Sequence, residues 1–225
     1  MAEKVGTEAK PLRVGVLASG GGTNLQSLID ACEAGRVDGA VVVVVSNNSK
    51  AGALQRARQH GIPARHLSNY HYADEGELDR AFVELLRSYD VNLVAFAGYM
   101  KKRGPAFLSA FPNRILNIHP ALLPGPHGGA GKYGLRVHES VLAAGDDVTG
   151  VTIHLVDERY DHGPVVARRE VPVLPGDTPE SLQQRVLAVE HELYPAVLAA
   201  VARGEIDLDA VAAGGDPAII AEREA

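Results

Sequence analysis

Leu12–Ala18 (LRVGVLA) and the Ser19–Asn24 turn (SGGGTN) that follows it determine the fold class of this chain. The first segment is apolar and rich in valine and leucine, which is typical of a buried strand. The glycine turn leads into Asn24–Ala34, where apolar residues recur at helical spacing. A strand, a tight turn and a helix in this order indicate the first part of a parallel α/β sheet.

The alternation of strand and helix continues along the chain. Further strands are predicted at Ala40–Val45, Ala64–Leu67, Val91–Ala97, Arg114–His119, Thr149–Val156 and Pro164–Val173. Further helices are predicted at Ala51–His60, Glu75–Tyr89, Val137–Ala144 and Thr178–Ala202. We therefore expect an α/β, Rossmann-like open sheet that is mostly parallel, with helices on both faces. The last two strands are predicted to form an antiparallel hairpin near the C-terminal part.

Length and composition indicate one globular domain over residues 1–225. The chain is 46% hydrophobic and 22% charged, which excludes a disordered chain. Its core is expected at about residues 12–202, and the segment from about 207 to 225 has so little pattern that we expect a loosely packed tail. The single cysteine, Cys32, excludes an internal disulfide framework and a cysteine-based zinc site.

Charge and hydropathy bear on whether the protein binds a membrane or a nucleic acid. The longest uniform apolar run, Val41–Val45, is far shorter than the roughly 20 residues of a membrane span. Residues 1–11 lack the apolar core of a signal peptide. We therefore expect a soluble, cytoplasmic protein with no membrane partner. The 28 acidic and 22 basic residues give a net charge of −6, which argues against nucleic acid as a partner.

The glycine turn is a candidate anion site. Glycines let a ligand approach the backbone, and free N–H groups at a helix start attract phosphate or carboxylate. The spacing is neither G-x-G-x-x-G nor that of a phosphate loop with its lysine. A plain tight turn with Thr23 as the helix cap therefore remains the alternative.

The most informative stretch is Asn117-Ile118-His119-Pro120. Asn117 and His119 are two residues apart on a strand, so they share a face, roughly 7 Å apart. Pro120 ends the strand and places the pair at its carboxyl end, where open α/β sheets bind ligands. An amide beside an imidazole there can polarise a carbonyl and move a proton. The alternative is a polar pair that only bonds neighbouring loops.

Carboxylates supply the remaining candidates. The turn between the last two strands holds Asp157 and Asp161, and either would raise the pKa of His119 by approaching it. The residues alone leave both open, together with a simple solvated turn. Glu190 lies within the apolar stripe of the long helix, so it needs a ligand or an internal partner. The nine histidines show no tight metal spacing, so we expect no metal.

Several segments together resemble the folate-dependent phosphoribosylglycinamide formyltransferase family. They are VGVLASGGGTNLQSLIDAC, VVVSNN, AFAGYMKK, RILNIHPALLP, GVTIHLVDERYDHGPVVA and VEHELYPAVL. They occur in the family's order over about residues 12 to 202. The NIHPALLP segment joined to the later D-x-G-P turn is the specific part of the signal. The glycine turn alone is not specific.

The resemblance implies an activity: formyl transfer from 10-formyltetrahydrofolate, the co-substrate, to the primary amine of glycinamide ribonucleotide in de novo purine synthesis. It implies roles for the matching residues, as follows. The implied catalytic residues are Asn117, His119 and Asp161. The phosphate of the ribonucleotide is implied to bind Gly22, Thr23 and Asn24, and its ribose to contact Glu190. Folate is implied to lie along the segment before the Asp161 turn and along Met100, Lys101, Lys102, Arg103 and Asn117. It also implies a cis peptide at Leu123-Pro124 and no metal.

The chain departs from the family in two places. Glu75 stands where many relatives carry an arginine for the glutamate end of folate, and Lys101, Lys102 or Arg103 would have to replace it. The loop at 125–134 (GPHGGAGKYG) is longer and richer in glycine than the commoner form. The roles of Lys132 and His138 beside this loop are therefore left open.

Three rival functions remain. Formyltetrahydrofolate hydrolases and methionyl-tRNA formyltransferases resemble this core, but they carry an added domain before it or after it. We expect no room for either domain in 225 residues, and the acidic charge fits tRNA poorly. A non-catalytic phosphosugar-binding module would use only the glycine turn and leaves Asn117, His119 and Asp161 unexplained. A monomer or homodimer is expected.

Overall fold

Seven strands form one mixed sheet in the computed structural model, which describes residues 11–218. The strands are β1 (Leu12–Leu17), β2 (Gly39–Ser46), β3 (Ala64–His66), β4 (Leu93–Phe96), β5 (Ile115–His119), β6 (Val148–Leu155) and β7 (Val165–Pro172). Their order is β3-β2-β1-β4-β5-β6-β7. Neighbours from β3 to β5 are parallel, whereas β6 is antiparallel to both β5 and β7. The predicted mostly parallel sheet with an antiparallel C-terminal hairpin is confirmed.

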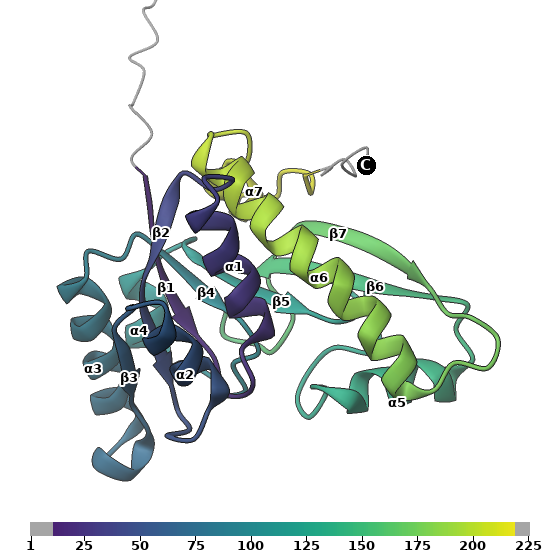
Figure 1. Cartoon of the computed structure of the whole chain (residues 1–225), viewed down its shortest axis with the longest axis horizontal. Coiled ribbons are helices and arrows are strands. Elements are labelled where there is room, and N and C mark those ends of the chain that lie inside the picture. The colour runs from purple at the N-terminus through teal and green to yellow at the C-terminus, as the bar shows by residue number, and fades with distance from the viewer. Residues whose placement is uncertain (1–10, 219–225) are drawn as a thin grey trace, which may run out of the picture.

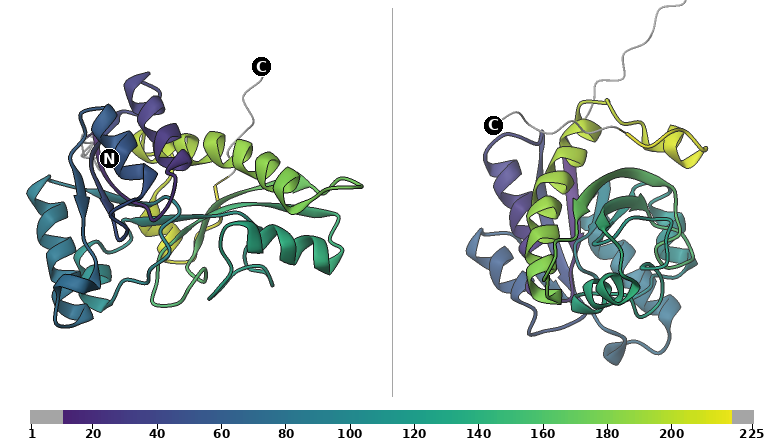
Figure 2. Two further views of the ribbon diagram at one scale, coloured as in Figure 1. Left: turned by 60° about the horizontal axis from the view of Figure 1, so that its bottom comes forward. Right: turned by 90° about the vertical axis from the view of Figure 1, so that its right-hand side faces the viewer.

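Helices cover both faces of the sheet (Figures 1 and 2). They are α1 (Thr23–Glu33), α2 (Gly52–Gln59), α3 (Glu75–Ser88), α4 (Pro105–Ala110), α5 (Leu135–Ala144), α6 (Pro179–Ala202) and α7 (Leu208–Ala212), with a 3-10 turn at Asn69–His71. The buried side chains of α1, α2 and α6 form one core with the sheet, and those of α3 and α4 form a second. This layering buries both faces of the valine-rich strands, as a parallel sheet requires.

The long helix α6 is capped at its start and bonded to the sheet further along. Thr178 and Ser181 form a reciprocal capping box at its start, so the first backbone N–H groups are satisfied. Further along, the fully buried Tyr194 donates its hydroxyl to the carbonyl oxygens of Phe96 and Leu116, at 3.3 and 3.1 Å. These bonds fix α6 over β4 and β5.

Two short helices were not predicted, and one of them corrects the expectation of a loosely packed tail. Asp207 caps α7 by accepting from two backbone N–H groups, and both Leu208 and Val211 are buried. Asp209 also bonds Arg114 at 2.7 Å, just before β5. Residues 207–212 therefore pack against the domain, and residues 219–225 lie outside the described part. The other unpredicted helix, α4, is only six residues long.

The strand order reverses beside β1, which lies between β2 and β4. Such a reversal leaves a crevice at the carboxyl ends of the two central strands, where open α/β sheets bind ligands. The glycine turn follows β1, the Gly98–Arg103 segment follows β4, and Pro120 follows β5. All three candidate ligand segments therefore emerge at one edge of the sheet.

Candidate active site

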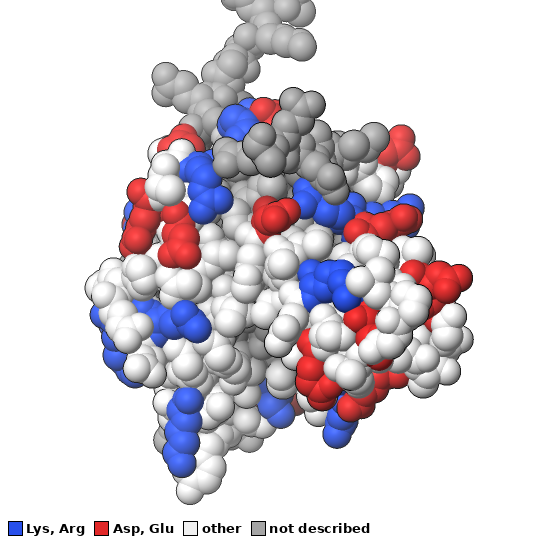
Figure 3. Space-filling view, turned by 45° about the vertical axis from the view of Figure 1, so that its right-hand side comes forward, with Lys and Arg blue, Asp and Glu red and all other residues white. Residues whose placement is uncertain are grey.

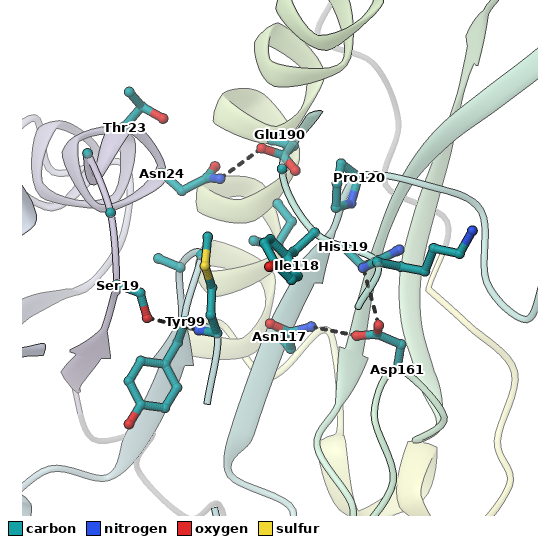
Figure 4. A pocket seen from close by; sticks show the side chains of 18 of the residues that line it. Ser19, Thr23, Asn24, Tyr99, Asn117, Ile118, His119, Pro120, Asp161 and Glu190 are labelled. Atoms are coloured by element: carbon teal, nitrogen blue, oxygen red, sulfur yellow. Dashed lines mark hydrogen bonds and ion pairs between the residues drawn. The ribbon is translucent and has the colours of Figure 1, made fainter. Parts of the chain in front are cut away.

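A cavity of about 890 Å³ lies at this edge of the sheet. Its walls are the glycine turn, the segment after β4, the end of β5, the 129–134 part of the long loop, and one face of α6. Nearly all the residues predicted from the sequence line it, with Thr23 at one end and Asp161 at the other (Figure 4). A volume of this size accommodates ligands of ordinary cofactor dimensions.

The glycine turn presents an uncapped helix start to the cavity. Gly22 is the residue before α1, with φ of 76°, and an added Cβ there would lie 2.7 Å from the Cα of Ala53. Only glycine fits that conformation and that close approach. No side chain caps the first N–H groups of α1, so the alternative of Thr23 as a cap is wrong. The free N–H groups make this end of the helix suited to an anion.

Asn24 connects the glycine turn to α6. Its side-chain amide donates to Glu190 Oε2 at 2.8 Å, and its own Oδ1 is buried with no partner. Glu190 is only 6% exposed, and burial raises the pKa of its carboxyl to about 7 against an ordinary 4.5. A buried carboxyl held by one hydrogen bond has unused acceptor capacity, which hydroxyl groups of a ligand would fill.

Asn117, His119 and Asp161 lie together at the opposite end of the cavity (Figure 4). The Asn117 amide donates to Asp161 Oδ1 at 3.3 Å, and His119 Nδ1 lies 3.5 Å from Asp161 Oδ2. His119 Nε2 bonds the backbone carbonyl of His127 at 2.9 Å. Asp157 instead accepts from the backbone N–H of Arg159 and pairs with His162. The structure therefore favours Asp161 over Asp157 as the partner of His119.

The charge state of the pair follows from burial. Desolvation lowers the pKa of His119, and the nearby Asp161 carboxylate offsets this only in part. We expected a nearby carboxylate to raise the pKa of His119. Asp161 does act in that direction, but desolvation is the larger effect, so the expectation is wrong for the pKa of His119 as a whole. For Asp161, burial acts to raise the pKa, but bonds from His154 and Gly129 and the proximity of His119 outweigh it, so the net pKa is lowered.

The segment after β4 is held at Met100 and at Arg103, with two exposed lysines between them. Met100 donates its backbone N–H to Ser19 Oγ at 2.9 Å, while Lys101 and Lys102 are exposed. Arg103 is buried: its guanidinium pairs with Asp79 at 3.5 Å and lies 4.6 Å from the centre of a phenylalanine ring. Lys101 and Lys102 are therefore the cations of this segment that are open to a ligand.

Two buried histidines lie beside the site: His154 was missed from the sequence, and His138 was named there with its role left open. His154 lies opposite Asn117 in the β5–β6 ladder, and its Nε2 is 3.0 Å from the Asn117 amide nitrogen. His138 on α5 lines the cavity and is buried with Nδ1 unpartnered. The antiparallel pairing of β5 with β6 would have revealed His154, but the sequence predicted only the β6–β7 pairing.

Among the described residues, no three histidine, cysteine or acidic side chains are arranged to hold a metal ion. None of the described helices is long and apolar enough to span a membrane. On the face of the described residues in Figure 3, basic and acidic side chains are interspersed and form no continuous basic surface. The peptide bond between Leu123 and Pro124 is cis.

Comparison with known proteins agrees with this site. The Formyl transferase family matches residues 12–198. Phosphoribosylglycinamide formyltransferase of Escherichia coli (strain K12) is 38% identical over 198 residues, 88% of this chain and 90% of that protein. The chloroplastic phosphoribosylglycinamide formyltransferase of Arabidopsis thaliana is 42% identical, covering 92% of this chain and 71% of that protein. Glycinamide ribonucleotide transformylase 1 from Symbiobacterium toebii superposes with a TM-score of 0.82 at 43% identity, covering 90% and 92% of the two chains.

Proposed function

The chain belongs to the formyl transferase family, and on that premise we propose that it transfers the formyl group of 10-formyltetrahydrofolate to the primary amine of glycinamide ribonucleotide. The product is N-formylglycinamide ribonucleotide. One observation carries the proposal: Asn117, His119 and Asp161 meet at one end of a cavity whose other end is an uncapped helix start. A formyl-transferring group and a phosphate site therefore share one cavity.

The amine substrate fits between these two ends. Its phosphate is assigned to the N–H groups of Gly22, Thr23 and Asn24, because they face the cavity without a side-chain cap. Its ribose hydroxyls are assigned to Glu190, whose buried carboxyl has acceptor capacity left over. This orientation directs the amine toward Asn117 and His119.

Formyl-folate enters along the segment after β4, over Met100, Lys101 and Lys102, with its formyl group near Asn117. We assign Arg103 to supporting this segment, because its guanidinium pairs with Asp79. The exposed ammonium groups of the two lysines suit the glutamate carboxylates of folate, which Glu75 would repel. The folate contacts and the amine site then meet at the catalytic trio.

The reaction forms one bond and breaks one. The substrate amine attacks the formyl carbon, negative charge develops on the formyl oxygen, and the bond from carbon to the folate nitrogen then breaks. Asn117 and the Nδ1 edge of His119 stabilise that oxygen, since the contacts of both groups to Asp161, at 3.3 and 3.5 Å, are longer than an ordinary hydrogen bond and are open to exchange. The proton lost by the amine goes to the departing folate nitrogen, with His119 assisting. Asp161 favours the protonated form of His119.

The test is a spectroscopic assay of 10-formyltetrahydrofolate consumption with and without glycinamide ribonucleotide. Consumption that requires the amine supports the proposal. Consumption without it indicates hydrolysis, consumption only with methionyl-tRNA indicates that other acceptor, and no consumption indicates a binding module. Chelators are expected to leave the rate unchanged. A cytoplasmic location and a monomeric or homodimeric state stay predictions, which fractionation and gel filtration check.

A further inference from the structure

A chain of polar contacts fixes one histidine of the long loop. His127 Nε2 lies 2.6 Å from Asp146 Oδ2, and its Nδ1 lies 3.0 Å from Ser140 Oγ. Lys132 Nζ donates to the same Ser140 oxygen at 2.8 Å. His127 itself is only 7% exposed. The loop, α5 and the turn after α5 therefore all contribute to holding a single imidazole.

The end groups of this chain define its direction. An ammonium group only donates and a carboxylate only accepts hydrogen bonds. The network is satisfied when Lys132 donates to Ser140, Ser140 donates to His127 Nδ1, and His127 Nε2–H donates to Asp146. Because both ring nitrogens are then engaged, the side chain holds the backbone of a glycine-rich loop in one position.

That backbone contacts both members of the His119–Asp161 pair. The His127 carbonyl accepts from His119 Nε2 at 2.9 Å, and the Gly129 N–H donates to Asp161 Oδ2 at 2.9 Å. Between them, a Cβ on Gly128 would lie 2.5 Å from a methyl carbon of Leu123 and 3.3 Å from Asp161 Cβ. A larger residue at this position would require the Leu123 side chain to move.

Two acceptor groups beside His119 favour the doubly protonated form of its imidazole. One ring nitrogen faces a carbonyl and the other faces a carboxylate, and neither group can donate. The carbonyl requires a proton on Nε2, and the Asp161 carboxylate 3.5 Å from Nδ1 favours a second proton there, which makes the imidazole a cation. Burial and the neighbouring histidines His154 and His127 act against this form, while Asp161 and the His127 carbonyl favour it.

We propose that His127 is a positioning residue, whose side chain, anchored by Asp146 and Ser140, holds its own carbonyl as the acceptor that stabilises protonated His119. The effect on His119 stands on the structure alone, whereas its kinetic consequence rests on the proposed formyl transfer. The long loop at 125–134 is then part of the reaction machinery and not only a cover for the cavity.

The test compares NMR titrations of the His119 imidazole in the wild-type protein and in His127→Ala, with the signal assigned from His119→Asn. In His127→Ala the carbonyl should no longer be held against the charged His119, and the weakened hydrogen bond should lower the pKa of His119 by about one unit. At neutral pH kcat should fall about tenfold and the alkaline limb of its profile should move to lower pH, with KM for the amine substrate unchanged. His127→Gln, which can still bond Asp146 and Ser140, should restore most of both values.

His60→Ala is the matched control, because it removes another histidine–carboxylate pair, with Glu33 at 2.8 Å, far from His119 along the chain. If His127→Ala does not fold, Asp146→Asn serves instead, since that side chain is 39% exposed. An unchanged His119 titration in a folded variant overturns the proposal. A shifted titration in a protein without formyl transfer would leave this inference standing and refute the proposed function.

Discussion

Replacing the buried carboxyl Glu190 with glutamine should stabilise the protein at neutral and alkaline pH. Glu190 is 6% exposed, and its pKa is raised from 4.5 to about 7 by burial. A carboxyl with a raised pKa is protonated more readily in the folded chain than in the unfolded chain. Its contribution therefore turns unfavourable as pH rises above 4.5, and the full cost is present above pH 7.

The magnitude follows from the two pKa values. Their difference, at 1.36 kcal/mol per unit, corresponds to about 3 kcal/mol above pH 7. Glutamine carries no charge and keeps an acceptor for the Asn24 amide. Glu190→Gln should therefore gain about 2 to 3 kcal/mol at pH 8 and nothing comparable at pH 4.5.

Urea unfolding between pH 4.5 and 8.5 measures this difference. The wild-type free energy of unfolding should fall relative to Glu190→Gln as pH rises, because only the wild type ionises at this position. Glu192→Gln is the control, since Glu192 lies on the same helix, is 71% exposed and pairs with Arg169. Equal pH dependence in the wild type and Glu190→Gln would refute the reasoning.

The same variant should raise KM for the amine substrate, because an amide accepts ribose hydroxyls less well than a carboxylate.

Three further predictions concern the catalytic trio and two buried groups. Alanine at Asn117, His119 or Asp161 should each lower kcat by about 100-fold or more while the circular dichroism spectrum is retained; a near-normal rate in the Asp161 variant would remove its assigned role. Burial lowers the pKa of His138 to about 4, so stability should fall as pH drops from 6.5 to 4 in the wild type and less steeply in His138→Gln, measured by thermal unfolding. Asp79→Ala leaves a buried guanidinium unpaired and should cost about 3 to 5 kcal/mol in urea unfolding; a loss below 1 kcal/mol would contradict the importance of this pair.

Local signals in the sequence predict most of the fold. Helical periodicity marks the five longer helices, and apolar runs mark the central strands, since burial on both faces leaves a continuous apolar pattern. The short helices α4 and α7 are too brief to show that periodicity. α7 is instead held by an aspartate cap and by an ion pair from Asp209 to Arg114, a contact that joins residues 95 positions apart.

The candidate site also combines features that are local in the sequence with contacts that join distant residues. The Asn117–His119 spacing and the glycine turn were recognisable because they are local features of one strand and one turn. The partner of His119 was not a local feature: the residues left Asp157 and Asp161 open, and only the family resemblance implied Asp161, because the two differ in how the turn folds back toward β5. His154 and His127 reach the trio through strand pairing and a long loop, so no short-range pattern indicated them.

Transfer of a labelled formyl group tests the central claim most directly. The protein is incubated with 10-[¹³C]formyltetrahydrofolate and glycinamide ribonucleotide, and the products are separated and examined by ¹³C NMR and mass spectrometry. We predict that the label appears on the amine of the ribonucleotide, and that this product is lost in His119→Ala. Label found only in free formate, or retained wholly on folate, would contradict the account.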